Sequence, residues 1–587
     1  MTETIHRNIG PIIEQIAEHS IWQLVEKPMW DKIFLPLILL AKLDSLLAEE
    51  YKKGDGIPHK KRISNMVEGL KAKPFQNSFV EEHHFTKTSP LHYILATSSN
   101  QPVKEALLAY IGGFPKETQS VFTRLELTPN PKTDGTLNWL DALGKERKKE
   151  ILEPLLQGIL EKIPFSSMSG TEMGMAFEDC IRLFNEAKKK DAGEHYTPRD
   201  AVRLLTRLLV NGDIPKDGEI VDFYDPTCGT GGILLEGEKE MLRRCLESKR
   251  RDVKIKLYGQ EQNPFTHAIC QTDLMLRGVD FRNIAEGNTL QIDLQKGIKF
   301  RYQGANPPYG LPWKKEQKEV EEEIAKKENG RFPAGAPKST SEAQLLFLQH
   351  MVSKMQDQDK GGGRIAVVLN GNPLFAGDAG QGDSDIRGYL LNKDLIETIV
   401  ALPKDMFFNT GIATYIWVLS NNKKPRRQGI VQLIDATDMG QKLPKSLGNK
   451  RYELTDETIR EIQSWHRDVA DETVDPRCKV VPKKFFGYHS VDIEEAPENG
   501  AKKGVRDTER IPLLDCPKGD HEELKNIIIG MRPTDAPNFK ITDVTIGWEI
   551  PFTQIFYKYE APEDPLVLAK KVQAAFANLK LDLSFFS

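Results

Sequence analysis

The chain has 587 residues, of which 39% are hydrophobic and 28% are charged, and its formal net charge is −4. This composition fits a folded chain of several domains and excludes a largely disordered one. The near-neutral balance argues against a protein that holds nucleic acid through its overall field, so any DNA contact needs a local basic surface or a partner.

The cysteine pattern and the apolar runs exclude several kinds of feature. None of the six cysteines forms a CxxC pair, so the sequence predicts neither a zinc site nor a redox pair. Their scatter suits a reducing cytoplasm. The first residues lack the apolar core of a signal peptide, and the longest apolar run, residues 33–41, is too short to span a bilayer. We therefore expect a cytoplasmic protein without a bound metal or a membrane segment.

Residues 12–51 follow a helical pattern in which Leu35, Leu39, Leu43 and Leu47 recur at the spacing of one helix face. Helical patterns with polar, proline-bearing breaks continue to about residue 160, without strand alternation or an internal repeat. We therefore expect residues 1–165 to form a helical N-terminal domain, whose chemistry the sequence does not reveal.

A helix start follows the break at Gly193. Thr197 can cap this helix with Pro198 at its first position, and residues 201–210 continue it with apolar side chains at helical spacing. The free N–H groups at a helix N-terminus attract an anion such as a carboxylate. For this segment alone, an ordinary capped helix is the simpler interpretation.

A nucleotide-binding unit is predicted next. Residues 219–225 form a short β-rich run that ends in Asp225, and a glycine-dense turn over residues 226–232 leads into a helix up to about residue 248. This strand–turn–helix order opens nucleotide-binding α/β folds. The turn has neither the GxGxxG spacing of dinucleotide sites nor the lysine of a phosphate-binding P-loop, so neither a dinucleotide nor a triphosphate is expected.

Three further strand ends follow, at Glu261, near Asn288 and at Asn306. An acidic residue at the tip of the second strand typically holds ribose hydroxyls in such folds. Asn288, near the third tip, can reach an adenine edge. Because the carboxyl ends of adjacent parallel strands form the ligand-binding edge of an open α/β sheet, we expect these residues to meet in one site.

The fourth strand ends in Asn306-Pro307-Pro308-Tyr309. The prolines fix φ and remove two backbone donors, and Asn306, which precedes a proline, is held extended. Its side-chain carbonyl and a proline carbonyl are then two acceptors beside the flat ring of Tyr309. They describe a pocket for a planar group that bears an NH2, although a proline-rich surface turn is an equal alternative for this segment taken alone.

Together, the order Tyr-Thr-Pro, Asp-Pro-x-Cys-Gly-Thr-Gly-Gly, Gly-Gln-Glu and Asn-Pro-Pro-Tyr resembles the S-adenosylmethionine-dependent amino-methyltransferases of DNA. It is most similar to the modification (M) subunit of type I restriction–modification systems, and segments as far as residues 546–553 share the likeness. The resemblance implies an α/β fold. A Rossmann-like methyltransferase domain would occupy residues 166–490, after the helical N-terminal domain, and a small C-terminal helical region would occupy residues 491–587.

The resemblance also implies adenine-N6 methylation of DNA, with S-adenosylmethionine as cofactor and no metal. The methionine end would lie at residues 196–199 and beside Asp225, the ribose at Glu261, and the adenine edge at Asn288, where an aspartate is common. The implied cofactor-binding residues are Glu194, His195, Tyr196, Thr197, Pro198, Arg199, Asp225, Thr227, Gly229, Thr230, Gly231, Gly232, Glu261 and Asn288. The implied catalytic residues are Asn306, Pro307, Pro308 and Tyr309, with Tyr309 stacked on an adenine flipped out of the duplex.

The same resemblance implies partners besides double-stranded DNA. Type I M subunits dock on a separate specificity (S) subunit, usually two M per S, and a restriction (R) nuclease–translocase subunit joins them for cleavage. The chain has no Walker motif, so any DNA-translocating motor lies on another chain. The last predicted helix, residues 565–579, has an apolar stripe that fits either that partner or its own domain.

Two other functions stay open as alternatives. A pocket for a planar amine also suits a glutamine amide or an RNA base, and the chain could instead be a catalytically silent assembly subunit. Residues 311–341 are charged and carry glycines and prolines, and we expect a mobile lid beside the active site or, alternatively, a solvated insertion.

Overall fold

The computed structural model describes residues 9–21, 25–53, 89–98, 102–129, 139, 149–187, 197–211, 214–407, 411–447, 449–495, 506–531, 539–557, 567–568 and 570–571. The chain divides into two units, Met1–Ile550 and Pro551–Ser587. In the second unit the structure describes α20 (Phe552–Phe556) and helical residues at 567–568 and 570–571. Most of the predicted helix at residues 565–579 therefore lies outside the described residues.

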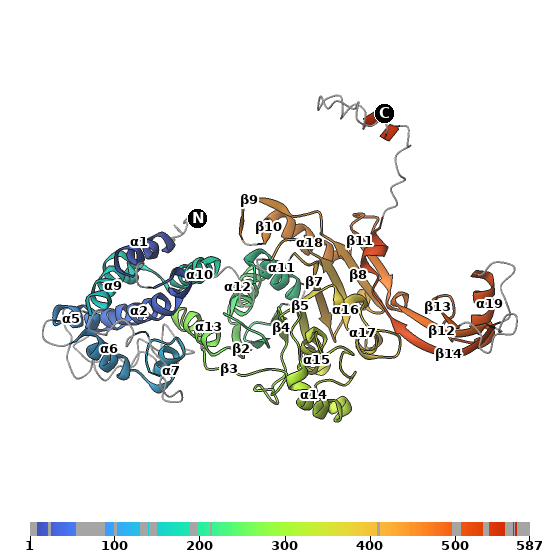
Figure 1. Ribbon diagram of the computed structural model, residues 1–587, viewed down its shortest axis with the longest axis horizontal. Coiled ribbons are helices and arrows are strands. Elements are labelled where there is room, and N and C mark those ends of the chain that lie inside the picture. The colour runs from blue at the N-terminus through green and yellow to red at the C-terminus, as the bar shows by residue number, and fades with distance from the viewer. Residues whose placement is uncertain are drawn as a thin grey trace, which may run out of the picture. The chain divides into compact units, whose positions relative to one another are not determined.

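The described N-terminal residues are helical, as expected (Figure 1). The leucines of the predicted stripe lie buried on α2 (Asp31–Lys53). Lys42 is buried beside them because its ammonium group donates to the carbonyl oxygens of Phe165 and Met168, each at 2.8 Å. The other helices of this part are α1 (Gly10–Ser20), α5 (Pro90–Ala96), α6 (Val103–Gly112), α7 (Lys116–Arg124), α9 (Lys149–Lys162) and α10 (Gly170–Ala187).

A nine-stranded sheet follows, in the order β11-β8-β6-β7-β5-β4-β1-β2-β3. Neighbouring strands pair in parallel except β7, which is antiparallel to β5 and β6, and β11, which is antiparallel to β8. The strands are β1 (Ile220–Asp225), β2 (Lys254–Glu261), β3 (Ile284–Glu286), β4 (Tyr302–Ala305), β5 (Arg364–Asn370), β6 (Ile396–Ala401), β7 (Thr414–Ser420), β8 (Ile430–Asp435) and β11 (Cys478–Pro482). The predicted α/β class is confirmed, and the four predicted strand ends belong to the adjacent strands β3, β2, β1 and β4.

Helices cover both faces of this sheet. Successive residues of a strand point to opposite faces. Phe223 packs against Gly237 of α12, whereas its neighbour Tyr224 hydrogen-bonds His350 of α15 at 3.1 Å. The helices and the hairpin of this part are α11 (Arg199–Leu209), α12 (Gly232–Glu247), α13 (Pro264–Leu276), α15 (Gln344–Ser353), α16 (Asn372–Phe375), α17 (Gly382–Asn392), α18 (Asp456–Asp468), β9 (Gln441–Leu447) and β10 (Lys450–Glu453).

Residues 311–341, for which we expected a mobile lid or a solvated insertion, pack as a folded segment. The segment contains the short helix α14 (Gln317–Ile324) between two 3-10 turns, Lys314–Glu316 and Lys327–Asn329. Its apolar side chains Trp313, Val320 and Phe332 are buried in a small core with residues of the neighbouring loop and of α15. This core was not predicted because charged stretches separate the three residues along the sequence, so they form no continuous apolar pattern.

The C-terminal region differs from the expected small helical region. Residues 487–548 contain a three-stranded antiparallel sheet in the order β13-β12-β14, built from β12 (Gly487–Glu495), β13 (Arg506–Pro512) and β14 (Phe539–Trp548). The helix α19 (His521–Met531) contributes Leu524 and Ile528 to its core. Val491 and Ile493 are buried there and alternate with polar residues, which is the period of a half-buried strand.

Candidate active site

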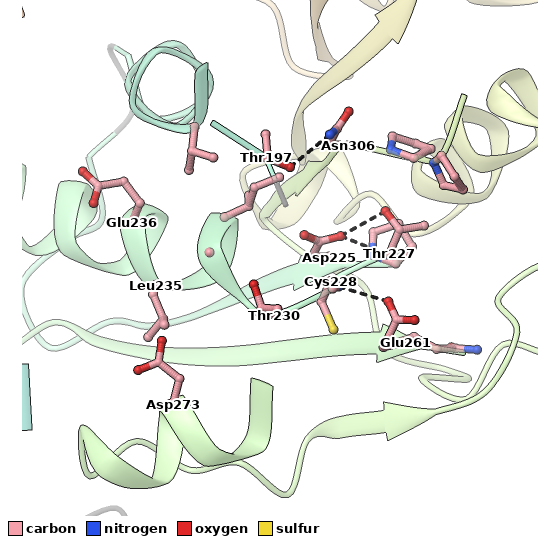
Figure 2. Close-up of a pocket in the computed structure, with 18 of the residues that line it drawn as sticks. Thr197, Asp225, Thr227, Cys228, Thr230, Leu235, Glu236, Glu261, Asp273 and Asn306 are labelled. Carbon is pink, nitrogen blue, oxygen red and sulfur yellow. Dashed lines mark hydrogen bonds between the residues drawn. The ribbon is translucent and has the colours of Figure 1, made fainter. Parts of the chain in front are cut away.

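The predicted strand ends meet around a cavity of about 1490 Å³ (Figure 2). The predicted site residues that line it are Thr197, Arg199, Asp225, Thr227, Gly229, Thr230, Gly232, Glu261, Asn288, Asn306, Pro307, Pro308 and Tyr309. Pro198 and Gly231 are buried and do not line the cavity. Glu194, His195 and Tyr196 lie outside the described residues.

The glycine turn between β1 and α12 permits a close backbone approach. Gly231 has a φ of +87°, and a Cβ there would lie 2.8 Å from the Sγ atom of Cys270. Both observations require glycine at this position. Gly232 opens α12 and lines the cavity, and nothing lies within 4 Å of the place where its Cβ would be. The turn therefore presents bare backbone to the cavity at the start of a helix.

Asp225 is the last residue of β1, and its carboxyl group is buried, with 1% of the residue's surface exposed. Its Oδ1 atom accepts hydrogen bonds from the backbone N–H of Thr227 at 2.9 Å and from the Thr227 hydroxyl at 3.4 Å (Figure 2). Burial, and secondarily the negative charge of Glu261, raise the pKa of Asp225 to about 8. Such a carboxylate favours a cationic ligand group, which would offset the cost of its burial.

Glu261, at the end of β2, is fixed by the backbone. Its Oε2 atom accepts from the N–H of Gly229 at 3.1 Å, and its Oε1 atom accepts from the N–H of Asn263 at 2.8 Å. An ionised carboxylate only accepts hydrogen bonds, at about four sites. Glu261 therefore presents a fixed acceptor group to the cavity.

Asn288 follows β3, and both ends of its amide are engaged. The Oδ1 atom accepts from the N–H of Leu290 at 2.9 Å, and the Nδ2 group donates to Oε1 of Glu316 at 3.0 Å. The adjacent hydroxyl of Thr289 donates to the carbonyl of Pro226 at 2.6 Å. The loop after β3 is thus tied to the turn after β1, across the width of the site.

The Asn306 turn follows β4, and its side chains form a connected set. The Nδ2 group of Asn306 donates to the Thr197 hydroxyl oxygen at 3.0 Å (Figure 2), and the Tyr309 hydroxyl donates to Oδ1 of Asn306 at 2.7 Å. The ring of Phe407 meets the ring of Tyr309 edge-on, with centroids 6.2 Å apart. Burial raises the pKa of Tyr309, so its hydroxyl stays protonated and able to donate.

Residues 169–506 match the model of the family described as N-6 DNA Methylase, which is more than half of the chain. The chain belongs to the N-6 DNA methylase family. The resemblance that the motifs suggested is thereby confirmed at the level of the family.

Relatives within this family are type I restriction enzyme methylase subunits. The chain is 28% identical over 324 residues to the MjaVII methylase subunit of Methanocaldococcus jannaschii. The aligned residues cover 54% of this chain and 52% of the relative. It is 29% identical over 272 residues to the HindI methylase subunit of Haemophilus influenzae, covering 46% of this chain and 55% of the relative. The chain thus spans about half the length of these curated relatives.

Solved structures share the fold of this N-6 DNA methylase family member. The type I restriction-modification system methyltransferase subunit from Streptococcus thermophilus superimposes with a TM-score of 0.62 at 21% identity, covering 81% of this chain and 95% of that one. A modification subunit of a putative type I restriction enzyme from Vibrio vulnificus gives a TM-score of 0.53 at 20% identity, covering 89% and 99%. Both likenesses support the α/β fold.

Sequence reasoning also missed Glu316 and Glu342, which hold loops of the site, and Phe407, which lines the cavity. Glu342 accepts from the backbone N–H of Gly310, directly after the Asn306 turn, at 3.1 Å. Both glutamates act on loops that are 28 and 32 residues away along the chain, so no local pattern reveals them. Phe407 is an apolar residue after β6, and its position in the sequence does not distinguish a core residue from a site residue.

Among the residues that the structure describes, no group of three histidine, cysteine, aspartate or glutamate side chains could hold a metal ion. No helix in the described part of the chain is both long and apolar enough to cross a membrane.

Proposed function

We propose that the chain is the M subunit of a type I restriction–modification system and methylates the N6 amine of adenine in DNA. The observation that carries the proposal is the meeting of two groups in one cavity. The carboxyl groups of Asp225 and Glu261 line the same cavity as Asn306, whose amide is oriented by Thr197. Membership of the N-6 DNA methylase family supports the reaction type.

The cavity residues fit S-adenosylmethionine as the cofactor. The buried Asp225 carboxylate suits the ammonium group of its methionine moiety, Glu261 suits the two ribose hydroxyls, and Asn288 suits the adenine edge. Bare backbone at Gly232 leaves room for close approach. When bound, this cofactor supplies an electrophilic methyl group on a sulfonium centre.

The Asn306 turn would hold the target amine. Oδ1 of Asn306 and the carbonyl oxygen of Pro307 would accept the two N–H groups, which draws the nitrogen lone pair out of conjugation with the ring and aims it at the methyl group. The Tyr309 hydroxyl takes one of the two lone pairs of Oδ1 in the structure, and the other lone pair would serve the amine. Flipping the base costs a few kcal/mol, and stacking on Tyr309 would return about 1–3 kcal/mol.

Partners are part of the proposal. The curated relatives are named as methylase subunits, which supports assembly with other chains. We propose a separate S subunit, with two M chains per S, and an R subunit that joins for cleavage. The net charge of −4 supports a need for phosphate and base contacts from elsewhere.

The direct test is methyl transfer to genomic DNA by the purified chain together with the proposed S subunit, followed by sequencing of the modified positions. We expect N6-methyladenine at one defined sequence. Asn306→Ala should abolish transfer and leave the affinity for the cofactor within about threefold, since its acceptor serves the target amine. Methylation of RNA or of a protein glutamine instead of DNA, or turnover of Asn306→Ala near that of the unmodified chain, would overturn the proposal.

A further inference from the structure

The loop after β3 is held by the packed segment 311–341 as well as by the sheet. Arg331 donates to the carbonyl oxygens of Thr289 and Leu290, the latter at 2.9 Å. Glu316 accepts from the amide of Asn288 at 3.0 Å. Glu316 and Arg331 are each only 8% exposed. Two buried charged groups thus reach from one inserted segment to three consecutive residues of a cavity-lining loop.

The Glu316 contact fixes which way the Asn288 amide faces. An amide has a donating and an accepting end, and a rotation by half a turn exchanges them. Glu316 can only accept when ionised, so it selects the Nδ2 end, and the N–H of Leu290 selects the Oδ1 end. One lone pair of Oδ1 remains, and Asn288 lines the cavity. The fixed amide therefore offers an acceptor to a ligand.

We propose that Glu316 is a positioning residue that fixes the Asn288 amide as an acceptor for the exocyclic amine of the cofactor's adenine ring. The inference rests on the proposed function, because it concerns the cofactor of that reaction. Through this contact, segment 311–341 would be a part of the cofactor site, although Glu316 itself does not line the cavity.

The pairing also explains why asparagine suits this chain at position 288. An aspartate there would set a second carboxylate about 3.0 Å from that of Glu316, and two buried like charges at that separation repel. An aspartate paired with a glutamine at 316 would restore a hydrogen bond with donor and acceptor exchanged. The acceptor offered to the adenine amine would be kept.

The first test measures binding of S-adenosylhomocysteine and of its inosine counterpart, in which a carbonyl replaces the adenine amine, by calorimetry with the full chain. The unmodified chain should prefer the adenine ligand by about tenfold or more, because the inosine carbonyl would face the Oδ1 acceptor. In Glu316→Ala only the N–H of Leu290 still orients the amide, so this preference should fall several-fold. A purely structural role would weaken both ligands equally and leave their ratio unchanged.

The second test exchanges the partners. Asn288→Asp should weaken binding of S-adenosylhomocysteine by about tenfold or more, and the double variant Asn288→Asp/Glu316→Gln should recover to within about threefold of the unmodified chain. Glu322→Gln is the matched control, since Glu322 is an exposed residue of the same segment. It should change neither the affinity nor the preference.

The two hypotheses fail separately. If the folded, unmodified chain binds neither nucleoside ligand, the proposed function is wrong. If it prefers the adenine ligand but Glu316→Ala keeps the same preference as Glu322→Gln, or the double variant binds no better than Asn288→Asp, the role of Glu316 is wrong and the proposed function stands.

Discussion

At the scale of single residues, the Asn306 amide depends on Thr197. The Nδ2 group donates to the Thr197 hydroxyl oxygen, which leaves Oδ1 facing the turn. Thr197→Val should lower kcat by an amount equal to about 1–3 kcal/mol, because a donor loses its acceptor. Thr197→Ser should keep most of the activity. If the affinity for the cofactor falls as much as kcat, Thr197 binds the cofactor, as the resemblance implied, instead of orienting Asn306.

Substitutions of Tyr309 should separate the role of its ring from that of its hydroxyl. Its hydroxyl donates to Oδ1 of Asn306, and its ring lies beside Phe407. Tyr309→Phe keeps the ring and removes one hydrogen bond to Oδ1 of Asn306, so kcat/KM for DNA should stay close to that of the unmodified chain. Tyr309→Ala should lose about 1–3 kcal/mol of transition-state stabilisation. An equal loss in both variants would show that the hydroxyl, not the ring, is needed.

The raised pKa of Asp225 predicts how the free energy of unfolding depends on pH. Its folded pKa is about 8 against an ordinary value of 3.8. The folded state therefore holds a proton that the unfolded state releases, and this group's contribution to the free energy of unfolding falls as pH rises from about 4 to 8. Asp225→Asn keeps an acceptor for Thr227 and removes that cost.

Without cofactor, the free energy of unfolding of Asp225→Asn in urea should exceed that of the unmodified chain by roughly 1–3 kcal/mol at pH 9, and by clearly less at pH 5. It should also lose most of its affinity for S-adenosylmethionine. The same difference in stability at both pH values would contradict a raised pKa.

At the scale of elements, the hairpin β9–β10 supports the loop that carries Phe407. Lys450 of β10 donates to both carboxylate oxygens of Asp200 at 2.9 Å and to the carbonyl of Met406 at 3.1 Å. Both charged side chains are 6% exposed. Lys450→Met leaves Asp200 buried without its counter-charge and should destabilise the chain by about 3–5 kcal/mol in urea unfolding.

The partner substitution provides the control for Lys450. The double variant Asp200→Asn/Lys450→Met removes both charges and should recover part of the loss, because the asparagine still accepts from the N–H of Leu454. If the single and double variants are equally unstable, packing of the lysine stem, not its charge, holds the hairpin.

The elements also show where sequence reasoning succeeds. The strand ends were predicted because each signal is local: a short β-rich run that ends in Asp225 before a glycine turn, and Asn306 before two prolines after the more polar strand β4. The β12–β14 sheet was missed although Val491 and Ile493 alternate with polar residues, because so short an alternation stands in a charged, proline-bearing region that was interpreted as a tail. The bond between Asn288 and Glu316 was missed because it joins residues far apart in sequence, whose meeting depends on the folding of the segment between them.

At the scale of the whole molecule, the net charge of −4 gives the chain little overall attraction for DNA. Specific recognition needs base contacts as well as phosphate contacts. We predict that the chain alone binds S-adenosylmethionine but binds DNA weakly, without sequence preference. Its DNA affinity should fall steeply with salt, with a slope of about −0.9 per phosphate contact in a plot of log K against log salt.

Adding the S subunit should convert this binding into site-specific methylation, with the mass of the complex giving the number of M chains per S. Truncation before Pro565 should weaken the complex if the predicted terminal helix docks on that partner, and should leave cofactor binding by the chain unchanged as the control. The partner requirement would be refuted by the purified chain methylating one defined sequence efficiently on its own, since all base-reading contacts would then belong to this chain.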